Sequence, residues 1–273
     1  MSLTEPRLLV QISDTHILPE GCWLDDLVDT AQALREAVRR VQMLRPRPLG
    51  VLITGDLVEG GSAAAYRHLR RLLAPLDMPV WLLPGNHDDR ALLRSAFPDH
   101  DWLQARASGA FIQYTVDLPG LRLVTLDTVV ANASHGSLCN DRLDWLDHTL
   151  GQAQDVATMI AMHHPPFATH IGHMDAMGLR EGANRLADIV ARHRQVERIV
   201  CGHIHRSVQR RLAGTVVMTV PSTAHQIALQ FGTTTGCFTL EPPALALHVW
   251  HSGPDIVSHH LPVGHFPGPF RFA

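Results

Sequence analysis

The sequence lacks the features that mark disulfide-rich, membrane-spanning and nucleic-acid-binding proteins. Its four cysteines lie far apart and form no Cys-x-x-Cys pair, which favours reduced thiols over a disulfide framework or a zinc knot. No apolar run approaches the roughly 18 residues of a membrane-spanning helix, and no basic segment followed by a long apolar stretch opens the chain, so we expect no signal peptide. A net charge of −3 gives no electrostatic case for nucleic acid or an anionic membrane as a partner. These absences predict a cytoplasmic protein whose partners are neither nucleic-acid polymers nor membranes.

The composition is that of an ordinary globular protein, except for its histidines. Hydrophobic residues make up 45% of the chain and charged residues 18%, as is usual for a packed domain. A length of 273 residues is within the range of single α/β enzymes, so we expect one domain over residues 1–273. Nineteen histidines are conspicuous, because histidine is normally among the rarer residues.

Apolar periodicity predicts an α/β fold. Strands at 7–12, 49–54 and 80–83 alternate with helices at 26–44 and 62–74, and this alternation calls for right-handed crossovers and a largely parallel sheet.

The rest of the chain is predicted to complete a sandwich of two sheets. The expected elements are a helix at 89–97, a hairpin at 111–116 and 121–126, a helix at 140–150, a strand at 157–162, a helix at 178–194 and a strand at 198–201. The last third is predicted to form an antiparallel second sheet from strands at 207–211, 215–220, 226–230, 235–240 and 245–250. We therefore expect two packed mixed β-sheets flanked by helices, with second-sheet strands and an irregular tail at about 207–273.

Five short polar clusters each follow an apolar, β-prone run. They are Asp14-Thr15-His16, Gly55-Asp56, Gly85-Asn86-His87-Asp88, His163-His164 and Gly202-His203-Ile204-His205. In an open α/β sheet, ligands bind beyond the carboxyl ends of the strands, so we expect these clusters to meet at one rim. Asp, His and Asn are ligands of divalent transition metals, and their number suits two ions.

The spacing within the clusters supports a metal site. A carboxylate can bridge two metals because each of its two oxygens offers a lone pair, and Asp56, in a tight Gly-Asp turn, is the best candidate. In Asp14-x-His16 and His203-x-His205 the two-residue spacing places both side chains on one face if the backbone is extended. Asp14 and Asp56 are the only anionic ligands, so two divalent ions leave the site with a net positive charge. Such a charge suits a hydroxide nucleophile and a phosphate oxyanion.

Each cluster alone also has a structural interpretation. The run at 85–88 would more often be a turn, Asp14-x-His16 fits a helix cap or a loop pair, and His203-x-His205 fits a satisfied pair on a strand. Their joint occurrence, each at the end of a strand, favours the metal site. The residues alone do not choose between His163 and His164.

Taken together, the five clusters resemble the calcineurin-like metallophosphoesterase family over residues 7 to about 206. Within that family, the Asn-His-Asp-Asp form at 86–89, the His-His-Pro-Pro run at 163–166, the segment at 221–226 and Asp29 at the start of the first helix are similar to class III cyclic nucleotide phosphodiesterases and bacterial glycerophosphodiesterases. Glu59 stands where purple acid phosphatases carry a metal-binding tyrosine, and the Asp-Arg-Gly run of Ser/Thr protein phosphatases is absent after Gly55-Asp56. Both relatives are therefore poor guides to this chain.

The resemblance implies a division of the ligands and further site residues. One metal would be held by Asp14, His16, Asp56 and His205, and the other by Asp56, Asn86, His163 and His203. His163 rather than His164 would be the ligand. Asn86 and His87 would contact the substrate, with His87 stabilising or protonating the leaving oxygen, and His225 would line the substrate pocket.

The predicted function is that of a binuclear metal-dependent phosphodiesterase acting on small phosphodiesters. The resemblance points to 3′,5′-cyclic nucleotides or glycerophosphodiesters as substrates and to a dimer or larger homo-oligomer. The alternatives are a phosphomonoesterase of the same fold and a non-catalytic interaction protein that retains its metals. The mixed His, Asp and Asn ligands admit iron, manganese, zinc or cobalt.

Residues outside the five clusters receive simpler interpretations. His68, His148 and His193 fall on predicted helices and are expected at the surface. His170 and His173 lie in a loop where either substrate contact or solvation is expected. Trp23 and Leu24 are expected either to wall the pocket or to pack, and the three histidines at 259, 260 and 265 to be packing or solvent residues.

Overall fold

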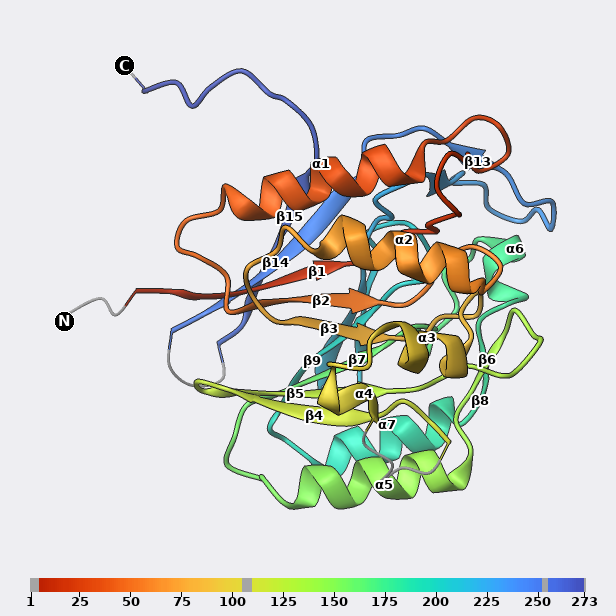
Figure 1. Ribbon diagram of the computed structural model, residues 1–273. Helices are drawn as coiled ribbons and strands as arrows, with labels where there is room; N and C mark the ends of the chain where they lie inside the picture. Colours follow the sequence, from red (N-terminus) through yellow and green to blue (C-terminus); the bar gives the residue numbers. More distant parts are fainter. Residues whose placement is uncertain (1–4, 105–109, 252–254, 273) are drawn as a thin grey trace.

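Two β-sheets lie face to face between layers of helices, which confirms the predicted fold class (Figure 1). The computed structural model describes residues 5–104, 110–251 and 255–272. In spatial order, the first sheet contains β15 (Val257–Pro262), β14 (Ala244–Trp250), β1 (Arg7–Ile12), β2 (Gly50–Thr54) and β3 (Val80–Leu83). The second contains β10 (Gln209–Leu212), β11 (Thr215–Thr219), β9 (Val196–Cys201), β7 (Thr158–Met162), β5 (Leu121–Leu126) and β4 (Tyr114–Leu118). Two short pairs are β6 (Gly136–Ser137) with β8 (Leu179–Glu181), and β12 (Gln226–Ile227) with β13 (Phe238–Thr239).

Helices cover the outer faces of both sheets (Figure 1). α1 (Thr30–Gln42) and α2 (Ala63–Leu73) lie over the first sheet, and α5 (Asn140–Gly151) and α7 (Ala183–Arg192) lie over the second. The shorter helices are α3 (Arg90–Ala96), α4 (Asp101–Gln104) and α6 (Gly172–Asp175). None of the described helices has the length and apolar character that crossing a membrane requires.

The central strands of the second sheet are buried on both faces. Successive side chains of a strand point to opposite faces, so in β7 Met159 and Ala161 pack between the two sheets. Ile160 and Met162 pack on the opposite face, against α5 and α7. Burial on both faces explains why this strand is a continuous apolar run without polar alternation.

α1 shows the helical counterpart of this pattern. Leu34, Val38 and Val41 recur at intervals of three or four residues and form its buried stripe. Asp29 caps the N-terminus, since its side chain accepts a hydrogen bond from the backbone N–H of Gln32 at 2.8 Å.

The carboxyl ends of the parallel strands meet at one edge of the sandwich. β1, β2 and β3 are parallel neighbours, and so are β5, β7, β9 and β11. Gln11 joins the two sheets, because its Nε2 donates to Thr54 Oγ1 in β2 and to the Cys201 carbonyl oxygen in β9, both at 3.0 Å. Its Oε1 faces Nε2 of His248 in β14 at 3.2 Å. The loops that follow these strands therefore share one rim.

The prediction that the last third forms a separate antiparallel sheet is wrong. β14 pairs antiparallel with β1 in the first sheet, whereas β10 and β11 extend the second sheet, with β11 parallel to β9. Only two-residue strands form in the segments 226–230 and 235–240. The edge strand β15 was not predicted, because its partly exposed VSHHLP sequence has little apolar character. The helix predicted from 178 begins only at Ala183, since the preceding residues form β8.

Two of three helix histidines expected at the surface are buried. His68 Nδ1 donates to the Leu18 carbonyl oxygen at 2.8 Å, and His193 Nε2 contacts Asp147 Oδ1 at 2.7 Å. Their acceptors come from segments remote in sequence, so helical periodicity could not reveal them. His148 is exposed, as predicted.

Candidate metal centre

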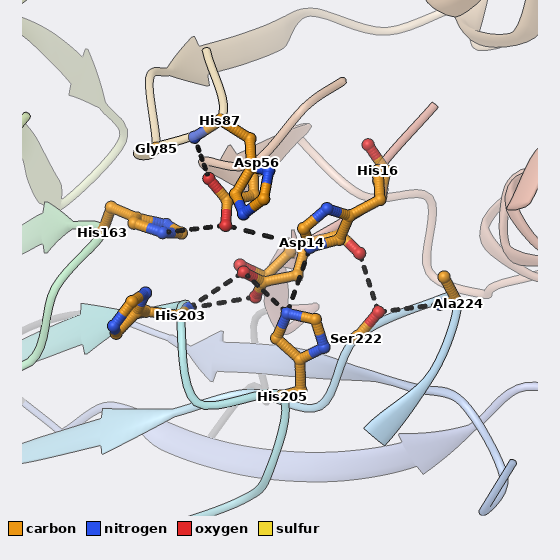
Figure 2. A network of polar contacts seen from close by, with 12 residues as sticks. Asp14, His16, Asp56, Gly85, His87, His163, His203, His205, Ser222 and Ala224 are labelled. Atoms are coloured by element: carbon orange, nitrogen blue, oxygen red, sulfur yellow. Dashed lines mark hydrogen bonds and ion pairs between the residues drawn. The ribbon is translucent and has the colours of Figure 1, made fainter. Parts of the chain in front are cut away.

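All seven predicted metal ligands come together at the rim where the parallel strands end. Figure 2 labels all of them except Asn86. Asp14 and His16 follow β1, and Asp56 follows β2. Asn86 follows β3, His163 follows β7, and the pair at 203 and 205 follows β9. Six of these side chains are buried, and Asn86 is partly exposed.

The backbone turns sharply at most of these positions. Five of the seven residues have a positive φ between 43° and 70°, a region that residues with a side chain rarely adopt. They are Asp14, His16, Asp56, His203 and His205. The expectation that extended backbone aligns the two Asp/His-x-His pairs is therefore wrong: tight left-handed turns bring both members of each pair to the site. Such conformations persist only where the surroundings enforce them, and they cluster at functional sites.

Glycines make room for this convergence. A Cβ on Gly85 would collide with the carboxylate and backbone of Asp56, and a Cβ on Gly55 would collide with the ring of His163. Both glycines immediately precede a predicted ligand, so they allow two strand ends to approach as closely as the site requires.

Asp56 lies between the histidines of the two predicted metal positions. Its Oδ2 is 3.3 Å from His163 Nε2 and 3.8 Å from His16 Nε2, while its Oδ1 accepts the backbone N–H of His87 at 2.9 Å. Asp14 is placed similarly, with Oδ1 3.5 Å from His205 Nε2. The central position of Asp56 is what a bridging carboxylate requires.

Hydrogen bonds at Nδ1 turn three histidine rings toward the centre. Nδ1 of His16 faces Glu59 Oε2 at 2.7 Å, Nδ1 of His163 faces the Thr54 carbonyl oxygen at 2.8 Å, and Nδ1 of His205 faces the His225 carbonyl oxygen at 2.9 Å. Oxygens of these kinds only accept, so each Nδ1 carries a hydrogen, and in the neutral form of each ring the lone pair is on Nε2. This outer hydrogen bond is typical of metal-ligating histidines.

The first group of lone pairs fits one ion. Nε2 of His16 and Nε2 of His205 lie 3.1 Å apart, although neutral rings held in this way have no hydrogen to share between them. Two nitrogens bonded to one ion at 2.0–2.1 Å in tetrahedral geometry lie roughly 3.3 Å apart. Asp14, His16, Asp56 and His205 all place a ligand atom within 4.8 Å of one another.

A second set of acceptors converges beside the first. His163 Nε2 lies 3.1 Å from Asn86 Oδ1, in addition to its contact with Asp56. Nε2 of His203 is buried and has no hydrogen-bond partner within the described part of the chain. Burial lowers the pKa of His203 to about 3, so its ring is neutral and its lone pair is available. The donor set of both groups therefore fits divalent transition metals.

His164 lies against this second group but is engaged elsewhere. His163, His164 and His203 place ring nitrogens within 4.8 Å of one another. However, Nδ1 of His164 is 2.8 Å from the Thr128 hydroxyl, and its Nε2 donates to the Ser134 carbonyl oxygen at 3.2 Å. Two protein partners leave His164 without a free lone pair, which favours His163 as the ligand.

The electrostatics of the site call for positive charge. Burial disfavours a charged carboxylate, but His163 outweighs it and holds the pKa of Asp56 well below its usual range. Burial likewise disfavours a charged ring, yet Asp56 raises the pKa of His163 to about 9. The same carboxylate that favours a proton on His163 would favour a metal ion in its place.

The remaining predicted residues border a cavity of about 290 Å³ above the ligands. His87 lines this cavity with its side chain 36% exposed, and its Nδ1 faces Glu59 Oε1 at 2.9 Å. Burial opposes charge on this ring, but the hydrogen bond to Glu59 raises the pKa of His87 to about 9. His225 lines the cavity, as predicted. Leu24 and His173, for which two roles were left open, line it as well.

Two residues considered for the pocket lie elsewhere, and others were missed. Trp23 is 53% exposed and lies outside the cavity lining, and His170 is exposed. Met174, Met177 and Ile227 form part of the lining but were not predicted. The only indication of their role in the sequence was proximity to His173 and to the segment at 221–226, because apolar residues that line a pocket cannot be told from core residues in a sequence.

Known proteins share both the sequence and the fold. The sequence model of the calcineurin-like phosphoesterase family matches residues 8–207. A probable glycerophosphodiester phosphodiesterase from Arcobacter nitrofigilis is 33% identical over 266 residues, which cover 97% of this chain and 96% of the relative. A 3′,5′-cyclic adenosine monophosphate phosphodiesterase from Pseudomonas aeruginosa is 35% identical over 222 residues, or 81% of this chain and 78% of the relative.

A solved structure extends the likeness to three dimensions. A dimetal phosphatase from Danio rerio superposes with a TM-score of 0.65 at 16% identity, covering 96% of this chain and all of that one. At that identity the match shows the fold alone. The family match over most of the chain and the two relatives above 30% identity establish that this protein is a member of the calcineurin-like phosphoesterase family.

Proposed function

We propose that the protein is a binuclear metal-dependent phosphodiesterase that hydrolyses small phosphodiesters. The observation that carries this proposal is the convergence of seven acceptor side chains on two adjoining positions around Asp56. Glycerophosphodiesters and 3′,5′-cyclic nucleotides are the leading substrates, because the relatives from Arcobacter and Pseudomonas bear those names. The cytoplasmic location and the homo-oligomeric state stay predictions.

The ligands divide between two positions. One ion would be held by Asp14, His16, Asp56 and His205, and the other by Asp56, Asn86, His163 and His203. Iron, manganese, zinc and cobalt all suit these donors. Such ions lower the pKa of a water molecule and neutralise charge that develops on phosphoryl oxygens.

The protein's own residues supply orientation and a proton. His87 follows the ligand Asn86 directly and lines the cavity with a partly exposed side chain, where it would reach a leaving oxygen. With Nδ1 held by Glu59, the other ring nitrogen is left to donate to that oxygen. Leu24, Met174 and Met177 give the cavity an apolar wall for the organic groups of the substrate.

The charge of the cavity favours diesters over monoesters. The lining includes the carboxylates of Asp25 and Glu59, and none of the described lining residues is an arginine or a lysine. A diester carries a single negative charge, whereas a monoester can carry two. Apart from His87 and the proposed metal ions, the described lining offers no strongly basic side chain to match a second charge, so the site suits the diester.

Substrate preference tests the proposal. The purified protein, loaded in turn with each of the four metals, would be given glycerophosphoethanolamine and cyclic AMP. Glycerol 3-phosphate and AMP serve as matched monoesters, and metal-stripped protein is the control. We expect hydrolysis of at least one diester to exceed that of its monoester and to require metal. A strong preference for monoesters would overturn the phosphodiesterase proposal.

A further inference from the structure

We propose that Glu59 is a positioning residue of the reaction, whose single carboxylate orients both His16 and His87. The inference rests on the proposed function, in which His16 binds a metal and His87 donates a proton. Glu59 does not contact the atoms that would bind the metal and donate the proton, which are the Nε2 atoms of the two histidines. It acts through the two rings.

The contact geometry supports a shared clamp. One oxygen, Oε2, is 2.7 Å from Nδ1 of His16, and the other, Oε1, is 2.9 Å from Nδ1 of His87. The two rings lie edge to face with centroids 4.9 Å apart. Both oxygens of the carboxylate are thus used, each by a different ring, and the side chain is 27% exposed at the cavity wall.

The carboxylate also decides which nitrogen of each ring is free. An ionised carboxylate accepts hydrogen bonds and donates none, so both rings must carry a hydrogen on Nδ1. Nε2 of His16 is then left with its lone pair, directed at His205 and Asp56. Nε2 of His87 is the nitrogen left for the substrate. One side chain therefore sets the working orientation of two residues with different tasks.

The backbone holds Glu59 where it can reach both rings. Its N–H donates to the Ile17 carbonyl oxygen at 3.0 Å, and Val58 forms a parallel bridge with Ile17. The Asp88 carboxylate accepts the N–H groups of Leu57 at 3.0 Å and Val58 at 3.3 Å. This segment is thus fixed between the loop that carries His16 and the loop that carries His87.

Glu59 differs from the other groups that orient ligand rings. His163 and His205 donate to backbone carbonyl oxygens, which no substitution removes. Among the acceptors that the described structure shows for the Nδ1 atoms of these three ligand rings, only the acceptor of His16 is a side chain. Charge-assisted hydrogen bonds are also stronger than neutral ones. Losing partners of this kind typically lowers metal affinity or activity by about 10- to 100-fold.

Three substitutions of Glu59 separate positioning from bulk structure. Glu59→Gln keeps the shape but offers one accepting oxygen for two rings, Glu59→Asp keeps the charge but is shorter, and Glu59→Ala removes both contacts. Glu20→Gln is the matched control, because Glu20 is an exposed glutamate whose side chain pairs with Arg71. Thermal unfolding checks that each variant folds. Glu59→Gln and Glu59→Asp remain informative if Glu59→Ala does not fold.

Three measurements test the effect of these substitutions on metal binding, catalysis and ring tautomers. In titrations of the metal-stripped protein with Mn²⁺, Glu59→Gln should bind the ion about 10-fold more weakly. Its kcat for an alkyl diester should fall about 10- to 100-fold with little change in KM, and the fall should be smaller for bis(4-nitrophenyl) phosphate. The ¹⁵N shifts of His16 should show mixed tautomers in Glu59→Gln and a single Nδ1–H form in the parent and in Glu20→Gln.

The result that overturns the inference is a Glu59→Gln protein with the parent's metal affinity, kcat and ring tautomers. If the parent protein hydrolyses no diester, the proposed function fails. The metal titration and the tautomer spectra would still decide the role of Glu59, because neither depends on turnover.

Discussion

Acidification should destabilise the fold through a histidine remote from the metal centre. His248 is fully buried in β14, with Nε2 donating to Gln11 Oε1 at 3.2 Å and Nδ1 2.8 Å from the Ser258 hydroxyl. Burial, aided by Arg198, lowers the pKa of His248 to about 3. The folded state therefore keeps this ring neutral, whereas in the unfolded chain it takes up a proton near pH 6.5. Stability from the neutral ring is complete above pH 6.5 and is lost progressively as the pH falls toward 3.

The size of the effect follows from the two pKa values. Between pH 7 and pH 5 this one group should lower the free energy of unfolding by about 2 kcal/mol. His248→Gln can replace both hydrogen bonds without titrating, at a cost of about 1 kcal/mol at neutral pH. Urea unfolding of the metal-stripped parent and variant should thus give stability curves that cross between pH 6.5 and 5. Curves that stay parallel over that range would refute a neutral buried His248.

Three further outcomes test the centre itself. Asp56→Ala should lose both ions and nearly all activity, because it removes a contact from each metal position. Asp99→Asn, at an exposed residue, serves as control, and an Asp56→Ala protein with the same metal content as the parent would refute the binuclear assignment. His163→Ala should lose metal, whereas His164→Ala should keep most of it and instead lose about 1–3 kcal/mol of stability from its unpaired buried partners; equal metal loss would contradict the choice of ligand. His87→Ala should slow alkyl diesters by about 10²–10⁴-fold at unchanged metal content, and comparable losses on nitrophenyl diesters would exclude His87 as the proton donor.

The sequence was most informative where local rules act. A buried parallel strand is a short apolar run, and the residue that follows it must lie at the carboxyl edge, so Asp14, Asp56 and His163 could be placed without coordinates. The helix caps follow equally local rules, as the contact of Asp29 with Gln32 illustrates.

Features that depend on contacts between distant parts of the chain could not be predicted from the sequence. β14 lies beside β1 although more than 230 residues separate their first positions. Neither strand's sequence indicates which strand it pairs with. The left-handed turns at His16 and His205 could not be foreseen, because glycine is the usual residue there and the surrounding contacts alone enforce them. Glu59 was noted only as a departure from other relatives, since its two histidine partners lie in different loops.

The distribution of ligands over the two sheets has a mechanical consequence. Asp14, His16, Asp56 and Asn86 follow strands of the first sheet, whereas the histidines at 163, 203 and 205 follow strands of the second. Each proposed ion would therefore bind side chains from both sheets and act as a crosslink across the open rim of the sandwich. Free metal at 100 times its dissociation constant stabilises a folded protein by about 2.7 kcal/mol per site. Metal supply would then govern how firmly the two halves are joined as well as how fast the enzyme turns over.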